Sequence, residues 1–267
     1  MLLRDLSLVI SSILIGIDKG GIPGVGSLGI ALSVLFSSET KHIIAMFTPV
    51  LFCSDLYISI VMRNKVEWNY VKSLAPSFLV GLLLGFMLIK IFTDSIVRKI
   101  AGYGLVILAT IHCIVKYGSR FSLLPSTNKT ISIAHILQLH KLQDIKDNHS
   151  TIVTYIVGLA SGLLSVVANV AGPLIAIYLV TSKISTLTIN STRAWIFTLA
   201  NLIKIPMHMF NSNLVYNDIP LITFLISVSL ASTYTTEKYI LPRINNKILE
   251  LLCWILILIA ALVCLYD

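Results

Sequence analysis

Charged residues are scarce in this chain. Asp, Glu, Lys and Arg together make up 12% of its 267 residues, whereas hydrophobic residues make up 56%. Because about 25% of the residues of a soluble domain are charged, this chain has too little polar surface for a soluble helical protein. Uncharged runs such as 73–89 and 219–236 approach the roughly 20 apolar residues that cross a bilayer. The composition predicts an all-α polytopic membrane protein.

Cysteine is also rare, and the spacing of the four cysteines fits neither a disulfide framework nor a zinc site. All four fall in apolar segments: Cys53, Cys113, Cys253 and Cys264. The six histidines show no convergent metal-ligand spacing. No nucleophile or metal constellation is apparent, so we expect no enzyme activity, no metal and no cofactor.

Acidic residues are outnumbered by basic ones, 12 against 20, which gives a net charge of +8. In a membrane protein, Lys and Arg report orientation before anything else. We therefore expect the lipid bilayer as a partner and no nucleic acid, and the sequence gives no signal of an oligomeric state.

The apolar runs predict ten helical elements. They are 6–17, 24–36, 43–62, 73–91, 100–115, 151–166, 173–182, 187–209, 219–236 and 248–266. The first and second, and the sixth and seventh, are too short to span singly. A glycine-containing break, "DKGGIPG" or "VANVAGP", separates the members of each pair. Each pair is either one broken spanning helix or a re-entrant hairpin.

Charge counting favours the hairpins. If both pairs crossed, the loops on the two sides would carry nine and eight Lys and Arg residues. If both are re-entrant, one side carries twelve: Arg63, Lys65, Lys72, Lys116, Arg120, Lys129, Lys141, Lys146, Lys183, Lys238, Arg243 and Lys247. The other side carries five: Arg4, Lys41, Lys90, Arg98 and Lys99. The positive-inside rule then places both termini outside.

This topology predicts two inverted repeats, each a re-entrant or broken hairpin followed by three transmembrane helices, as in many secondary transporters. The repeats would be 1–115 and 151–267, joined by a cytoplasmic connector at 116–150. An offset of 146 residues superposes the halves and places Gly26 on Gly172 and Asp55 on Asn201.

The first break contains G-V-G-S-L-G, which matches a dinucleotide-binding spacing from Gly24 to Gly29. That motif requires a preceding strand and a βαβ unit, and both are missing from this apolar surrounding. A helix that starts after the glycines instead directs unpaired N–H groups and a positive dipole end into the break. Two such helix starts near the midplane would attract an anion. The alternative is that the glycines only permit tight packing.

Polar residues at membrane depth support the anion. A charge there costs several kcal/mol, so each one is a candidate functional residue. They are Asp18, Lys19, Asp55, Asn169, Arg193, Asn201 and Lys204. Three cations favour an anionic substrate. Asp18 either neutralises a cation or relays a proton, and Asp55 is a candidate for proton coupling.

The predicted substrate-binding residues combine both breaks with the polar residues of the following helices. They are Lys19, Gly24, Gly26, Asn169, Gly172, Asn201 and Lys204. Arg193 is not included in this set, and a position facing a loop or a headgroup is the alternative for it. Pro173 is expected to open the second half-helix, where no N–H is needed. Gly81 and Gly85 form a small-xxx-small pair that predicts a close helix–helix contact.

Several stretches resemble the TauE/SafE family of sulfite and organosulfonate exporters over nearly the whole chain. They are "DKGGIPGVG" with Asp55, "VVANVAGPLIAIYL", and "TRAWIFTLANLIKIP" with Ala-Trp-x-Phe and Asn-x-x-Lys-x-Pro. The resemblance implies a multi-pass transporter of the bacterial inner membrane that exports sulfite or a small organosulfonate. A transporter of another small anion, such as a carboxylate, and a membrane assembly factor without transport activity are the alternatives.

Overall fold

The computed structural model describes residues 2–37, 39–100, 102–104, 106, 151–169, 171–180 and 184–240. This part of the chain is helical and contains no strand. Its main helices are α1 (Leu2–Gly20), α2 (Val25–Leu35), α3 (Thr40–Val61), α4 (Trp68–Ile91), α7 (Thr151–Val167), α8 (Ala171–Val180), α9 (Thr186–Phe210) and α10 (Ile219–Thr235). The predicted connector 116–150 and the predicted element 248–266 lie outside the described residues, as does most of 100–115.

These eight helices confirm eight of the ten predicted elements, with shifted ends. Helix α4 begins at Trp68 rather than at residue 73. Lys72, which the sequence reading assigned to a loop, lies on an exposed part of this helix, where a lysine stem can extend to water. Helix α8 begins at Ala171, so Pro173 is its third residue and not its first. A proline is tolerated throughout the first helical turn, because no N–H there has an intrahelical partner.

Three helices in the described part are long and apolar enough to cross a membrane: Thr40–Val61, Trp68–Ile91 and Tyr216–Ile240. With 22 residues, α3 is about 33 Å long, close to the thickness of the hydrocarbon core. The exposed side of α4 carries Leu83, Met87 and Ile91, as expected of a surface that faces lipid. The fold is that of a helical membrane protein. The number of crossings and the inverted relation of the halves remain predictions.

The two short pairs are antiparallel hairpins. In the first, Ser11 Oγ donates a hydrogen bond to the carbonyl of Gly29, and Ser33 Oγ donates to the carbonyl of Ser7 at 3.3 Å. Residues later in α1 therefore contact residues earlier in α2, so the two helices are antiparallel. In the second, the hydroxyls of Thr154 and Tyr178 lie 2.8 Å apart and join the start of α7 to α8. Neither pair is one continuous broken helix.

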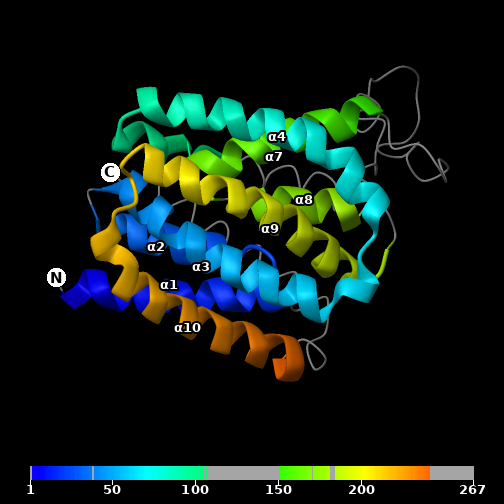
Figure 1. Ribbon diagram of the computed structural model, residues 1–267, viewed down its shortest axis with the longest axis horizontal. Coiled ribbons are helices and arrows are strands. Elements are labelled where there is room, and N and C mark those ends of the chain that lie inside the picture. Colours follow the sequence, from blue (N-terminus) through cyan, green and yellow to red (C-terminus); the bar gives the residue numbers. More distant parts are fainter. Residues whose placement is uncertain are drawn as a thin grey trace, which may run out of the picture.

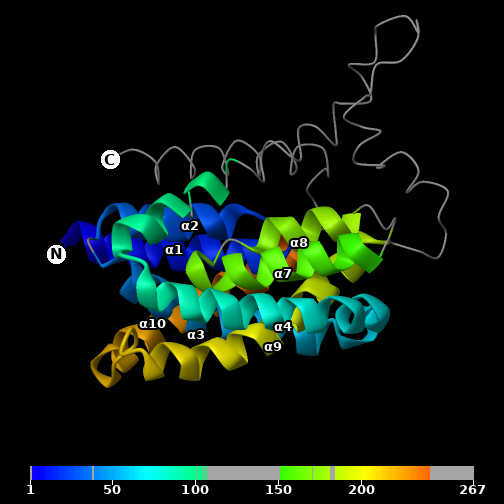
Figure 2. The same cartoon turned by 90° about the horizontal axis from the view of Figure 1, so that it is seen from above.

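The helices run side by side, with α3 against α9 in the centre (Figure 1). Helices α4 and α7 pack together on one flank, and α1 and α10 pack together on the other (Figures 1 and 2). Each flank therefore joins the hairpin of one half of the chain to a long helix of the other half. The buried hydrophobic cluster runs through both halves and includes Phe47, Phe78 and Phe197.

Small residues set the spacing on both flanks. A Cβ on Gly81 would collide with the carbonyl of Leu159, and one on Gly85 would lie 2.9 Å from the carbonyl of Leu163. This confirms the predicted close contact of Gly81 and Gly85. On the other flank, a Cβ on Gly20 would lie 2.5 Å from the Cβ of Thr236. Close backbone approach of this kind is how helices associate in lipid.

Candidate functional site

The two hairpin turns meet beside the middle of α3 and α9, where a small cavity lies between them. Residues of both breaks and of both central helices line it: Asp18, Lys19, Gly26, Ser27, Ile30, Leu51, Ser165, Asn169, Ala171, Gly172, Phe197, Asn201 and Lys204. Its volume is about 20 Å³, which is room for about one water molecule. In this conformation the cavity is too small for an anion of several atoms.

Left-handed backbone forms both turns. In the first, Gly21 has a φ of 132° and Gly24, the residue before α2, has a φ of 100°. Glycine adopts these angles without the steric cost that other residues meet. In the second turn, Asn169 has a φ of 54°, and asparagine is among the few other residues that tolerate this region. The glycine-rich sequence of the first break is therefore required by its backbone.

The start of α2 is occupied by a carboxylate of the protein itself. Asp18 Oδ2 accepts hydrogen bonds from the backbone N–H of Gly24 at 3.1 Å and of Gly26 at 3.0 Å. The prediction that the N–H groups of this break are free to bind substrate is therefore wrong. The cause is local, because the last turn of α1 carries an acid that reaches across the hairpin to the start of α2.

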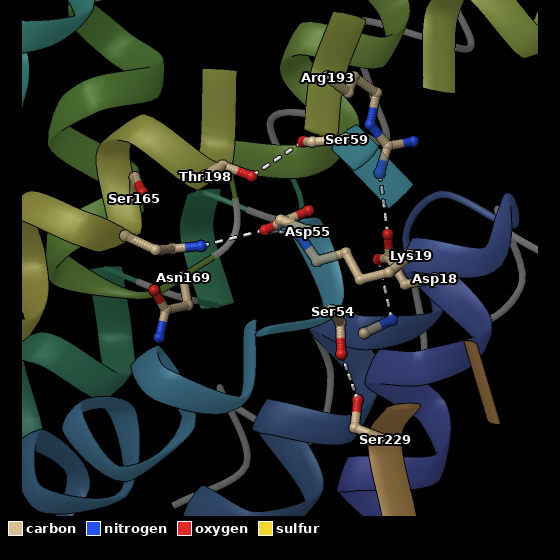
Figure 3. A network of polar contacts seen from close by, with 12 residues as sticks. Asp18, Lys19, Ser54, Asp55, Ser59, Ser165, Asn169, Arg193, Thr198 and Ser229 are labelled. Carbon is tan, nitrogen blue, oxygen red and sulfur yellow. Dashed lines mark hydrogen bonds and ion pairs between the residues drawn. The ribbon is translucent and has the colours of Figure 1, made fainter. Parts of the chain in front are cut away.

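Arg193 holds the other oxygen of the same carboxylate. Its Nη2 lies 2.9 Å from Asp18 Oδ1, and the side chain is only 2% exposed (Figure 3). This burial excludes the alternative that Arg193 faces a loop or a headgroup. Of the two roles considered for Asp18, neutralising a cation is the one the contacts support. Among the described residues, Arg193 Nε and Nη1 have no hydrogen-bond partner.

A second buried ion pair joins the first hairpin to α3. Lys19 Nζ lies 2.9 Å from Asp55 Oδ2, and it also lies 4.8 Å from the centre of the Phe197 ring. Asn201 Nδ2 donates to the same Asp55 oxygen at 3.0 Å. Asp55 and Asn201, which the 146-residue offset superposes, are thus in direct contact between α3 and α9. The charge of Lys19 is balanced before any substrate arrives.

Lys204 has neutral partners. Its Nζ donates to the carbonyl of Ser165 at 2.9 Å, to Ser165 Oγ at 3.2 Å and to Asn169 Oδ1 at 2.5 Å. The three N–H donors of the ammonium are therefore in use. No carboxylate in the described part of the chain lies within 4.0 Å of this nitrogen. Lys204 is 1% exposed, so its charge is both buried and without a counter-ion among these residues.

Among the described residues, the charged side chains at the cavity do not cancel. Five buried Lys, Arg and Asp residues line it or contact its lining, three cations and two acids: Lys19, Arg193, Lys204, Asp18 and Asp55. Two ion pairs use both acids, and one positive charge is left, on Lys204. A buried charge without a partner is costly, and a single bound anion would balance it.

Six of the seven predicted substrate-binding residues line the cavity, and the exception is Gly24. Asp55 lies next to the lining, through its contacts with Lys19 and Asn201. Sequence reasoning did not select Ser165, which binds Lys204 twice. The sequence contained a signal for Ser165, because the 146-residue offset superposes it on Lys19, a predicted substrate-binding residue. No group of three metal-ligating side chains occurs among the described residues.

Comparison with known proteins gives a family. The chain matches a protein-family model described as "Sulfite exporter TauE/SafE" over residues 8–264, which is nearly its full length. No curated protein and no solved structure matches the chain.

Proposed function

This chain belongs to the TauE/SafE family of sulfite exporters, and from that premise we propose that it exports sulfite or a small organosulfonate across the bacterial inner membrane. The family implies a membrane transporter of sulfite or related anions rather than an enzyme. The main support for a binding site is the positive charge of Lys204. It lies in the cavity between the two hairpin turns and has no counter-ion among the described residues.

The substrate anion binds at the second break, between Lys204 and the start of α8. An anionic oxygen replaces Asn169 Oδ1 on the ammonium, since a hydrogen bond between two charged groups is stronger than one to a neutral amide. Gly172 leaves space there, because the nearest atom to a Cβ built on it is Arg193 Nη2 at 3.8 Å. The positive end of the α8 dipole favours the same position.

The surplus of one positive charge fits a monoanion, such as hydrogen sulfite or an organosulfonate, or a dianion that enters with a proton. We assign proton coupling to Asp55, the acid in contact with both Lys19 and Asn201. Replacing Asp55 with Asn should flatten the pH dependence of transport while the protein stays folded. An unchanged pH profile would leave Asp55 with a hydrogen-bonding role only.

Substrate binding requires the cavity to widen, and we propose that it does so by alternating access between two inverted halves. The helix contacts support this relation, because α4 with α7 and α1 with α10 are equivalent pairs under the exchange of the halves. In this topology the α3–α4 loop is cytoplasmic and the α9–α10 loop is periplasmic. Cysteines introduced at Asn64 and Asn217, in a background without the native cysteines, should be labelled from opposite sides. Labelling from one side would contradict the inverted halves.

The decisive experiment is anion flux in proteoliposomes, with sulfite, taurine, sulfoacetate, sulfate and acetate offered separately. Lys204→Ala should raise the half-saturating concentration of the transported anion by about ten- to a hundredfold, the equivalent of roughly 1.5–3 kcal/mol for a hydrogen bond to a charged group. Lys204→Arg should restore only part of the affinity, because a planar guanidinium does not replace a compact ammonium. Lys72→Ala, an exposed lysine on α4, is the matched control.

The flux assay also separates the alternative functions. Selective transport of acetate would replace the sulfur substrate with a carboxylate. An assembly factor would transport none of these anions, and its activity would survive Lys204→Ala.

A further inference from the structure

We propose that the first break is a second anion-binding site, and that the side chain of Asp18 occupies it as a built-in ligand that keeps substrate anions out. The inference rests on the proposed function only in assigning the substrate to the second break. The ligands of the first break would be small oxyanions, such as formate, acetate and sulfite.

The contacts of the Asp18 carboxylate are those of a bound oxyanion. Two backbone N–H groups at the start of α2 donate to one oxygen, at 3.1 Å and 3.0 Å, and a guanidinium donates to the other at 2.9 Å. The donors come from two elements, α2 and α9, that are far apart in the sequence. Oriented amides at a helix start together with an arginine are a recurring way to bind free carboxylates, sulfate and phosphate.

The backbone of the break is shaped around the carboxylate. A Cβ on Gly26 would lie 2.9 Å from Asp18 Oδ2 and 3.1 Å from Asp18 Cβ, so only glycine admits the acid so close. Gly24 reaches the angle that aims its N–H at the same oxygen only through a left-handed φ of 100°. Removing the carboxylate would leave this cradle of donors in place and buried.

Arg193 has more hydrogen-bond donors than its contact with Asp18 uses. The guanidinium is 2% exposed, and its Nε and Nη1 have no partner in the described part of the chain. Unsatisfied donors of a buried charged group are costly. An oxyanion that replaced the Asp18 side chain would meet both backbone N–H groups and the full positive charge of Arg193.

The second break carries no such acid. Under the 146-residue offset, Leu164 occupies the position of Asp18, and Ser165 that of Lys19. The second break therefore remains available to substrate, and the first is closed by the protein's own charge. Without Asp18 the cavity region would have two surplus positive charges, on Arg193 and Lys204, and two anions would bind.

The test replaces Asp18 with Ala and measures sulfite binding and thermal unfolding in detergent, with the variant purified in formate. We expect Asp18→Ala to bind one more sulfite per chain than the unchanged protein does. Formate should raise its unfolding temperature by several degrees, because a ligand that binds only the folded state stabilises it. The unchanged protein should show a smaller response, because only the second break is open to formate there.

The double variant Asp18→Ala, Arg193→Met is the control, since it lacks both charges and should lose the extra sulfite and the additional formate response. The variant Asp18→Ala, Lys204→Ala distinguishes the two sites. It should keep the additional formate response, even if sulfite does not bind at Lys204 and the proposed function fails. Asp18→Asn keeps the shape without the charge and serves as the folding reference.

Two results would overturn the proposal. One is an Asp18→Ala protein that folds but neither binds additional sulfite nor responds to formate more strongly than the unchanged protein. The other is an Asp18→Ala protein that cannot be recovered in formate although Asp18→Asn folds, because a free carboxylate would then be unable to replace the tethered one.

Discussion

The two breaks have the same construction and differ in how their buried charges are balanced. Each is a left-handed turn between antiparallel helices that places the start of a short helix near the centre of the molecule. At the first, Asp18 and Arg193 close the helix start with an internal ion pair. At the second, the partners of Lys204 in the described part of the chain are neutral, among them Asn169. Under the proposed function, the acidic residue at the first break is what distinguishes a structural joint from a binding site.

The largest difference between the breaks should appear when each loses its cation. Arg193→Met would leave Asp18 buried without its partner, and breaking a buried ion pair from one side costs roughly 3–5 kcal/mol. Lys204→Met removes a charge that has no counter-ion among the described residues and leaves only neutral acceptors unpaired, so its stability loss should be smaller than that of Arg193→Met. Chemical denaturation in detergent measures both variants. Equal stability losses would show that the two cations have the same role.

The second break can be converted to resemble the first. In Ser165→Asp, a carboxylate would stand where Ser165 Oγ now lies 3.2 Å from Lys204 Nζ. The introduced carboxylate should weaken sulfite binding by about ten- to a hundredfold. This corresponds to the roughly 1.5–3 kcal/mol that a hydrogen bond to a charged group contributes. Ser165→Asn is the neutral control and should retain binding. Undiminished sulfite affinity in the Asp variant would place the anion away from Lys204.

Alanine at the equivalent glycines compares the space at the two breaks. Gly26→Ala would push the Asp18 carboxylate off its backbone donors and should cost about 1–3 kcal/mol, as overpacking does. Gly172→Ala places its Cβ 3.8 Å from the nearest atom, an ordinary contact, and should cost less than about 1 kcal/mol. Unfolding temperatures of the two variants test this. A Gly172→Ala loss as large as that of Gly26→Ala would mean that the second break is as tightly filled as the first.

The smallest effect concerns a polar contact that belongs to neither break. Ser54 and Ser229 join α3 to α10 through hydroxyls 2.9 Å apart (Figure 3). Side-chain hydrogen bonds within membranes average about 0.6 kcal/mol. A double-mutant cycle with alanine at both positions should therefore give a coupling of about that size, with sulfite affinity unchanged. A coupling comparable to the loss in Arg193→Met would contradict the view that the ion pairs dominate.

Much of the fold follows from the sequence, because apolar length sets a spanning helix and glycine marks a break. Six of the thirteen residues that line the cavity follow as well, since polar groups such as Asn169 and Lys204 are rare at membrane depth. The pairing of the charges does not follow. Asp18 precedes Lys19 in the sequence and yet pairs with Arg193. Which cation has no acid among the described residues depends on how α1, α3 and α9 are set against one another.

The crossing of partners between the halves has a consequence for how the protein is made. Helix α4 packs on α7, and α1 packs on α10, with glycines such as Gly81 and Gly20 at the contacts. Helices α1 and α4 are synthesised before α7 and α10. The glycine-containing surfaces of α1 and α4 therefore have no partner helix until the second half is inserted. Assembly of either flank therefore waits for the later helices, and a chain interrupted before α7 has neither flank closed. Two halves produced as separate polypeptides should accordingly accumulate only when they are produced together.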